Sequence, residues 1–76
     1  MKRMVGDFEI VASSNLDYEH MTTEVIFGNV QILRFDIEDS GEMKVEVLGG
    51  PPSGRHRVAD LIEAIECAQR LLRERT

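Results

Sequence analysis

Residues 21–38, MTTEVIFGNVQILRFDIE, decide the fold of this 76-residue chain. Apolar and polar side chains alternate on both sides of Gly28-Asn29, which is the period of strands with one buried face. Glycine and asparagine both tolerate positive φ, so Gly28-Asn29 is typical of a tight hairpin turn. The stretch therefore predicts two antiparallel strands, 21–27 and 30–38.

The same alternation occurs on either side of this hairpin. Residues 8–12 predict a strand before it, and residues 43–47 predict a strand after it. Residues 39–42, Asp-Ser-Gly-Glu, have the composition of a second hairpin turn. Because the connections are short, an antiparallel meander of four strands is the simplest topology. Alternation directs these side chains toward the core: Phe8, Ile10, Ala12, Met21, Thr23, Val25, Phe27, Leu33, Phe35 and Ile37.

The apolar period changes from two to that of a helix after the loop 49–57. Residues 58–75 predict a helix whose apolar stripe is Val58, Leu61, Ile62, Ile65, Ala68 and Leu72. We expect this stripe to pack on Phe8, Val25, Phe35 and Val45. The predicted fold is α+β: a four-stranded antiparallel meander with one C-terminal helix on one face (ββββα, two layers). Residues 1–76 form a single domain, with the strands within 7–48.

Composition limits the cellular setting. No apolar run approaches the length of a membrane span, and Asp7 and Glu9 interrupt any signal-peptide core. Cys67 is the only cysteine, so an intrachain disulfide is excluded. We therefore expect a cytoplasmic protein without a membrane partner.

Net charge is −5 and is unevenly distributed. Residues 1–48 carry ten acidic residues against four basic ones, whereas residues 49–76 carry four against five. An acidic half repels nucleic-acid phosphates and attracts basic proteins, and aromatic residues are only 5% of the chain. The expected partner is a protein and not a nucleic acid. The alternative is that these acids only keep a small sheet soluble.

Groups that support catalysis are few. His20 and His56 are the only imidazoles, and Cys67 lies mid-helix beside the apolar stripe, where a structural thiol is expected. Asp17, Glu19 and His20 make only a weak metal-ligand set. We predict no enzymatic activity, no cofactor and no metal.

The loop 49–57, GGPPSGRHR, places two arginines before the predicted helix. Pro51 and Pro52 remove main-chain donors that a phosphate-binding loop needs, and the Gly-Lys-Ser/Thr ending is absent. We interpret the loop as a connector first and, through Arg55 and Arg57, as a contact second.

One sheet face is left uncovered in this two-layer arrangement. By alternation it displays acids interspersed with aliphatics, which is either an ordinary solvated face or a contact surface. The predicted partner-binding residues are Glu24, Ile26, Ile32, Asp36, Glu38, Glu46, Arg55 and Arg57.

The order of these motifs resembles small bacterial immunity proteins that neutralise polymorphic or contact-dependent toxins. The resemblance rests on residues 9–13 (EIVAS), Tyr18, residues 23–29 (TEVIFGN) and the helix segment 60–66 (DLIEAIE). It implies an inhibitor that occludes a basic toxin surface, and it transfers no individual site residue. The alternative is a homo-oligomeric structural or interaction module, in which the aliphatics or a sheet edge pair two copies.

Overall fold

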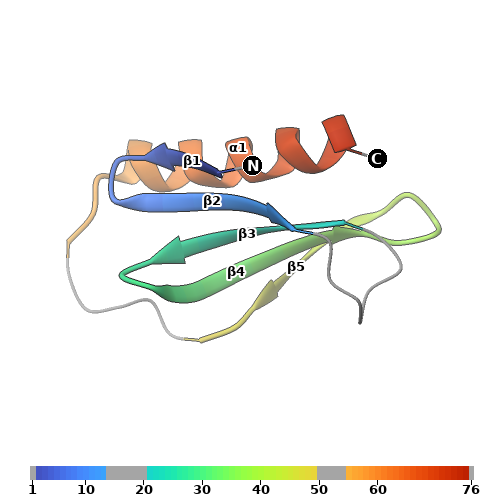
Figure 1. Ribbon diagram of the computed structural model, residues 1–76, viewed down its shortest axis with the longest axis horizontal. Helices are drawn as coiled ribbons and strands as arrows, with labels where there is room; N and C mark the ends of the chain where they lie inside the picture. The colour runs from blue at the N-terminus through green and yellow to red at the C-terminus, as the bar shows by residue number, and fades with distance from the viewer. Residues whose placement is uncertain (1, 14–20, 50–54, 76) are drawn as a thin grey trace.

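The computed structural model describes residues 2–13, 21–49 and 55–75 and contains five strands and one helix (Figure 1). The α+β class, the antiparallel sheet and the single C-terminal helix are confirmed, whereas the count of four strands is wrong. The strands are neighbours in chain order, so the sheet is a meander. The elements are β1 (Lys2–Val5), β2 (Phe8–Ser13), β3 (Thr22–Phe27), β4 (Val30–Ile37), β5 (Met43–Val47) and α1 (Val58–Arg75).

β1 is the strand that the sequence pattern missed. It pairs antiparallel with β2, with Val5 opposite Phe8 and Lys2 opposite Val11. The turn between them is only Gly6-Asp7, and Gly6 has a φ of +56°, which glycine adopts without a steric penalty. Three of the four residues of β1 are exposed, so its side chains show no alternation and main-chain pairing holds it in place.

The two predicted hairpin turns are present. Gly28 and Asn29 have φ values of +57° and +65°, as a type I′ turn requires at both positions. In the next turn, the Gly41 amide donates to the Glu38 carbonyl at 2.8 Å, and the Glu38 amide donates to the Glu42 carbonyl at 2.9 Å. These turns set the register of β3, β4 and β5.

A β-bulge changes which face Ile32 occupies. Val25 pairs with Leu33, but Ile26 pairs with Gln31, so β4 carries one extra residue at Ile32. The bulge turns this side chain into the core, where it is 7% exposed. The prediction that Ile32 lies on the uncovered face is therefore wrong.

α1 packs on the sheet through a different stripe from the predicted one. Its buried residues are Ala64, Cys67, Ala68, Leu71 and Leu72. In contrast, Val58 and Ile62 are 71% and 51% exposed, so the buried stripe is rotated by roughly a quarter of a turn from the expected one. Small side chains let α1 approach β2 and β3 closely, and the Thr23 hydroxyl donates a 2.9 Å hydrogen bond to the Ala68 carbonyl at this contact.

The rotation leaves one side of the sheet without a helix above it. α1 contacts β1, β2, β3 and β4, but among the described residues none of its Cα atoms comes within 8 Å of one in β5. Figure 1 shows α1 running along β1 and β2, with β5 at the opposite edge of the sheet. The core therefore lies between α1 and the strands β2 and β3, with Ile32 and Phe35 of β4 completing it.

Candidate interaction surface

β5 carries two strongly exposed apolar side chains on the helix-facing side of the sheet. Val45 and Val47 pair with Phe35 and Leu33, which places them on the same face as the core. They are nevertheless 50% and 70% exposed. The expectation that α1 covers Val45 is wrong, because α1 lies over β2 and β3 instead.

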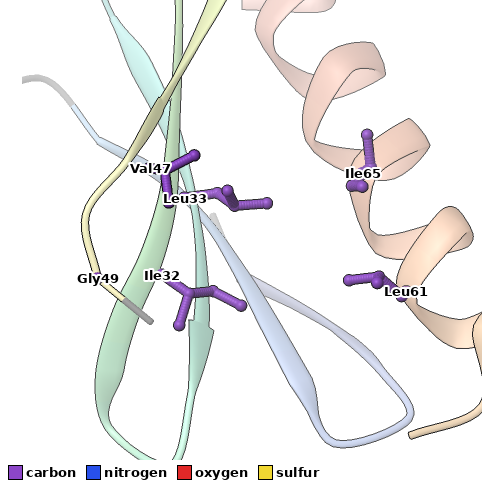
Figure 2. Close-up of a pocket in the computed structure, with 6 residues that line it drawn as sticks. All are labelled: Ile32, Leu33, Val47, Gly49, Leu61 and Ile65. Atoms are coloured by element: carbon purple, nitrogen blue, oxygen red, sulfur yellow. The ribbon is translucent and has the colours of Figure 1, made fainter. Parts of the chain in front are cut away.

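An apolar groove continues this surface toward the helix (Figure 2). It has a volume of about 220 Å³ and is lined by Ile32, Leu33, Val47, Gly49, Leu61 and Ile65. In Figure 2, Leu61 extends from α1 toward Ile32, and Leu33 extends from β4 toward α1. We name Leu33, Val45, Val47, Leu61 and Ile65 the apolar flank.

Sequence reasoning assigned most of these residues to the core and therefore missed the apolar flank. Leu61 and Val45 are apolar at positions where the period points inward, so the pattern alone does not separate them from core residues. The available signal is the stripe of small residues Ala64, Cys67 and Ala68, which marks the side of the helix that can approach a sheet most closely.

The main chain of β5 has a free outer edge. The Leu48 amide donates to the Ile32 carbonyl at 3.0 Å, so even-numbered residues of this strand direct their main-chain groups toward β4. Met43, Val45 and Val47 consequently direct theirs away from β4. No other described strand lies beyond β5, so the edge is a template for another strand.

Charged side chains of β5 lie on the opposite face of the sheet. Lys44 Nζ is 2.9 Å from Glu38 Oε1, and Glu46 Oε1 is 3.7 Å from Arg34 Nη1. Lys44 and Glu46 both have side chains 57% exposed. The hydrogen bond to Glu38 and then the charge of Glu38 raise the pKa of Lys44 above its ordinary 10.5.

Glu24 is the centre of a polar network on that open face. Its carboxylate accepts hydrogen bonds from Gln31 Nε2 at 2.6 Å and from Ser13 Oγ at 3.3 Å. Arg34 Nε lies 3.9 Å from Glu24 Oε1. Glu24 is only 7% exposed, and these neighbours within the chain satisfy its carboxylate.

The remaining predicted partner-binding residues lie in two places, the open face of the sheet and the segment before α1. Ile26 and Asp36 are half-buried on β3 and β4, whereas Glu38 and Glu46 are exposed near the β5 side of the open face. Arg55 and Arg57 are exposed before α1, and the Arg57 carbonyl accepts amide hydrogen bonds from Asp60 and Leu61. The structure thus groups Asp36, Glu38 and Glu46 but removes Ile32 from this set.

The two described groups with catalytic potential, Cys67 and His56, both lie among apolar neighbours. Cys67 is buried in the core, as expected of a structural thiol. The His56 ring packs against Phe27 and Phe8, with centroid distances of 4.5 Å and 5.3 Å, and so attaches the loop before α1 to the sheet. His20, with Asp17 and Glu19, lies outside the described residues, as do Pro51 and Pro52. Within the described part of the chain, no group of three or more His, Cys, Asp or Glu side chains is arranged to hold a metal ion.

Comparisons with protein-family models, with curated proteins and with solved structures gave no match. Across residues 2–13, 21–49 and 55–75, no helix is both long and apolar enough to cross a membrane.

Proposed function

We propose that this chain is a non-enzymatic protein-binding domain whose contact surface is the apolar flank together with the free edge of β5. The observation that carries the proposal is Val47, a valine 70% exposed on an edge strand and at the rim of an apolar groove. Exposed apolar side chains beside unpaired main-chain groups favour strand-to-strand association with another protein.

The chemistry of the groove supports a protein partner over a small molecule. All its lining side chains are aliphatic apart from Gly49, so it offers no polar side chain to orient a ligand. Its volume is also below the range of typical ligand pockets. An edge strand next to an open apolar groove suits a protein surface better.

We also propose a cytoplasmic location. The single cysteine supports it, because small domains of oxidising compartments usually rely on disulfides for stability. Buried Cys67 then remains reduced within the core.

Site-specific photo-crosslinking tests the proposed function. Benzoylphenylalanine is incorporated at position 47 or, as a matched control, at position 4, because Met4 is 61% exposed on the other edge strand. In cells that make the protein naturally, we expect a discrete adduct from position 47, identified by mass spectrometry, and none from position 4. Equal labelling at both positions, or no adduct from position 47, contradicts the proposal.

A second candidate is an immunity protein that occludes a basic toxin surface. The exposed carboxylates of Glu38 and Glu46 on a chain of net charge −5 favour it, since such charges accelerate association with a cationic partner. The Asp36→Lys/Glu38→Lys variant should then lose affinity for a purified basic partner. Glu63→Lys/Glu66→Lys, the same charge change on exposed helix positions, is the control. Unchanged binding by the first variant contradicts this candidate.

A further inference from the structure

We propose that β5 pairs antiparallel with β5 of a second copy of this chain, in the register that places Val45 opposite Val45 across a two-fold axis. The inference rests on the proposed function and names the occupant of its contact surface. It follows from the direction of the main-chain groups, the alternation of side chains and the order of charges in Met43-Lys44-Val45-Glu46-Val47.

The main chain permits this register. Met43, Val45 and Val47 direct their N–H and C=O groups to the outer edge. The hydrogen bonds of Glu42 and Leu48, the residues just before and just after β5, require this direction. With Val45 on the axis, Met43 lies opposite Val47 of the second copy, so the odd-numbered residues, whose main-chain groups face outward, pair with one another. Each of these pairs exchanges both main-chain hydrogen bonds, as in an ordinary antiparallel ladder.

Charge selects this register over its neighbours. Lys44 lies opposite Glu46 of the second copy, and the symmetry repeats this contact with the roles exchanged. A shift of two residues in one direction places Lys44 opposite Lys44, and in the other direction it places Glu46 opposite Glu46. Like charges directly opposite each other destabilise a strand pair. A shift of one residue places apolar side chains on the charged face and is excluded by the period.

The intrachain ion pairs extend across the proposed interface. Lys44 already lies beside Glu38, and Glu46 beside Arg34. Pairing therefore produces an alternating row on the open face: Glu38 and Lys44 of one copy, then Glu46 and Arg34 of the other. Surface ion pairs contribute little affinity, so the row sets register and orientation, whereas the main chain and valines supply the attraction.

The other edge of the sheet is unsuited to the same association. β1 has four residues and carries Lys2 and Arg3 but no acid, so two copies of β1 would bring like charges together. Short, basic edge strands are a recognised protection against pairing. The sheet is therefore protected at β1 and self-complementary at β5. Since one short strand per copy is a small interface, we expect a dissociation constant in the micromolar range.

A charge-swap experiment tests the register. In Lys44→Glu both contacts become Glu–Glu, and in Glu46→Lys both become Lys–Lys, so each variant should dimerise at least about tenfold more weakly than the parent. An equimolar mixture of the two variants restores Glu–Lys at both contacts. Sedimentation velocity should show heterodimers of twice 8.6 kDa in the mixture but monomers in each variant alone. Circular dichroism checks that both variants are folded.

A second pair of variants keeps the proposal testable if a charge swap unfolds the chain. Val45→Lys places two lysines on the axis at a half-exposed position, and it should abolish dimers, whereas Val45→Thr keeps the branched shape and should retain them. A parent that is monomeric at millimolar concentration, or a charge-swap mixture that stays monomeric while both variants fold, overturns the register. An adduct between position 47 and a different, identified protein overturns the second copy as occupant but leaves the proposed function intact. Absence of any adduct contradicts both.

Discussion

The hydroxyl of Thr23 on β3 donates a 2.9 Å hydrogen bond to the main-chain carbonyl of Ala68 in α1, and both residues are buried. This bond joins the helix directly to the middle of the sheet. It also explains why α1 lies over β2 and β3, since a hydroxyl reaches a helix carbonyl only where the two backbones approach closely. The exposure of β5 is a consequence of that position.

Thr23→Val should lower the free energy of unfolding by about 1 kcal/mol, because the shape is kept and one buried hydrogen bond is lost. Urea unfolding measures the change. Thr22→Val is the matched control, since Thr22 is equally buried but its hydroxyl makes a longer contact of 3.4 Å with Ser13 Oγ. If Thr22→Val lowered the free energy of unfolding as much as Thr23→Val, the hydrogen bond to Ala68 would not anchor α1.

The rotation of α1 predicts which apolar helix residues stabilise the fold. Leu71 is 1% exposed, so Leu71→Ala should cost about 2–5 kcal/mol by loss of burial and creation of a cavity. Ile62 is 51% exposed, so Ile62→Ala should change the free energy of unfolding by no more than about 0.5 kcal/mol. Thermal or urea unfolding measures both losses of stability. A larger loss in Ile62→Ala than in Leu71→Ala would show that the helix packs through the stripe expected from periodicity.

Gly6, in the turn between β1 and β2, lies close to Asp60 in the first turn of α1. Its φ is +56°, and a Cβ added there would lie 2.6 Å from Asp60 Oδ2. Gly6→Ala should therefore cost about 1 kcal/mol or more. Gly28 has nearly the same φ as Gly6 but open space around it. We therefore expect Gly28→Ala to lower the free energy of unfolding by less than Gly6→Ala does. Asp60→Ala should relieve part of the Gly6→Ala penalty, and a double-mutant cycle with no coupling would contradict this contact.

The Lys44–Glu38 pair gives a defined dependence of stability on pH. The pKa of Lys44 is higher in the folded chain than its ordinary 10.5, mainly because of the hydrogen bond to Glu38. The pair therefore stabilises the fold at pH values below 10.5, and its contribution is lost as pH rises through the raised pKa. In Glu38→Gln the pKa of Lys44, followed by NMR of the side-chain nitrogen, should return toward 10.5. An unchanged pKa would show that the pair does not form in solution.

Local chemistry accounts for the parts of the fold that the sequence predicts. Gly28-Asn29 supplies the positive φ values of its turn, and the alternation around it specifies β3 and most of β4. β1 could not be predicted from alternation, because its side chains are largely exposed and main-chain hydrogen bonds pair it with β2. The position of Ile32 does not follow from alternation, because a single bulge residue inverts the alternation there.

The candidate surface was not predictable from the pattern, because it depends on where the helix docks. Leu61 and Val45 have the same apolar character whether α1 covers β4 and β5 or β2 and β3. The position of α1 over β2 and β3 is determined by Ala64 and Ala68, whose small size allows the closest approach, and by the hydrogen bond of the Thr23 hydroxyl. Such tertiary packing leaves no periodic signal. In contrast, the sequence alone gives the order of charges around Val45, and its consequence for pairing follows once β5 is known to be an edge strand.

Amide hydrogen exchange of the unmodified protein, followed by NMR over a range of concentrations, tests the central claim most directly. Pairing of β5 with a second copy should slow exchange and shift the resonances of the Met43, Val45 and Val47 amides as concentration rises. The amides of Lys44 and Glu46, which face β4, should already be protected and change little. Fast exchange at Met43, Val45 and Val47 at every concentration, or changes confined to β1 or the open face, would contradict the account.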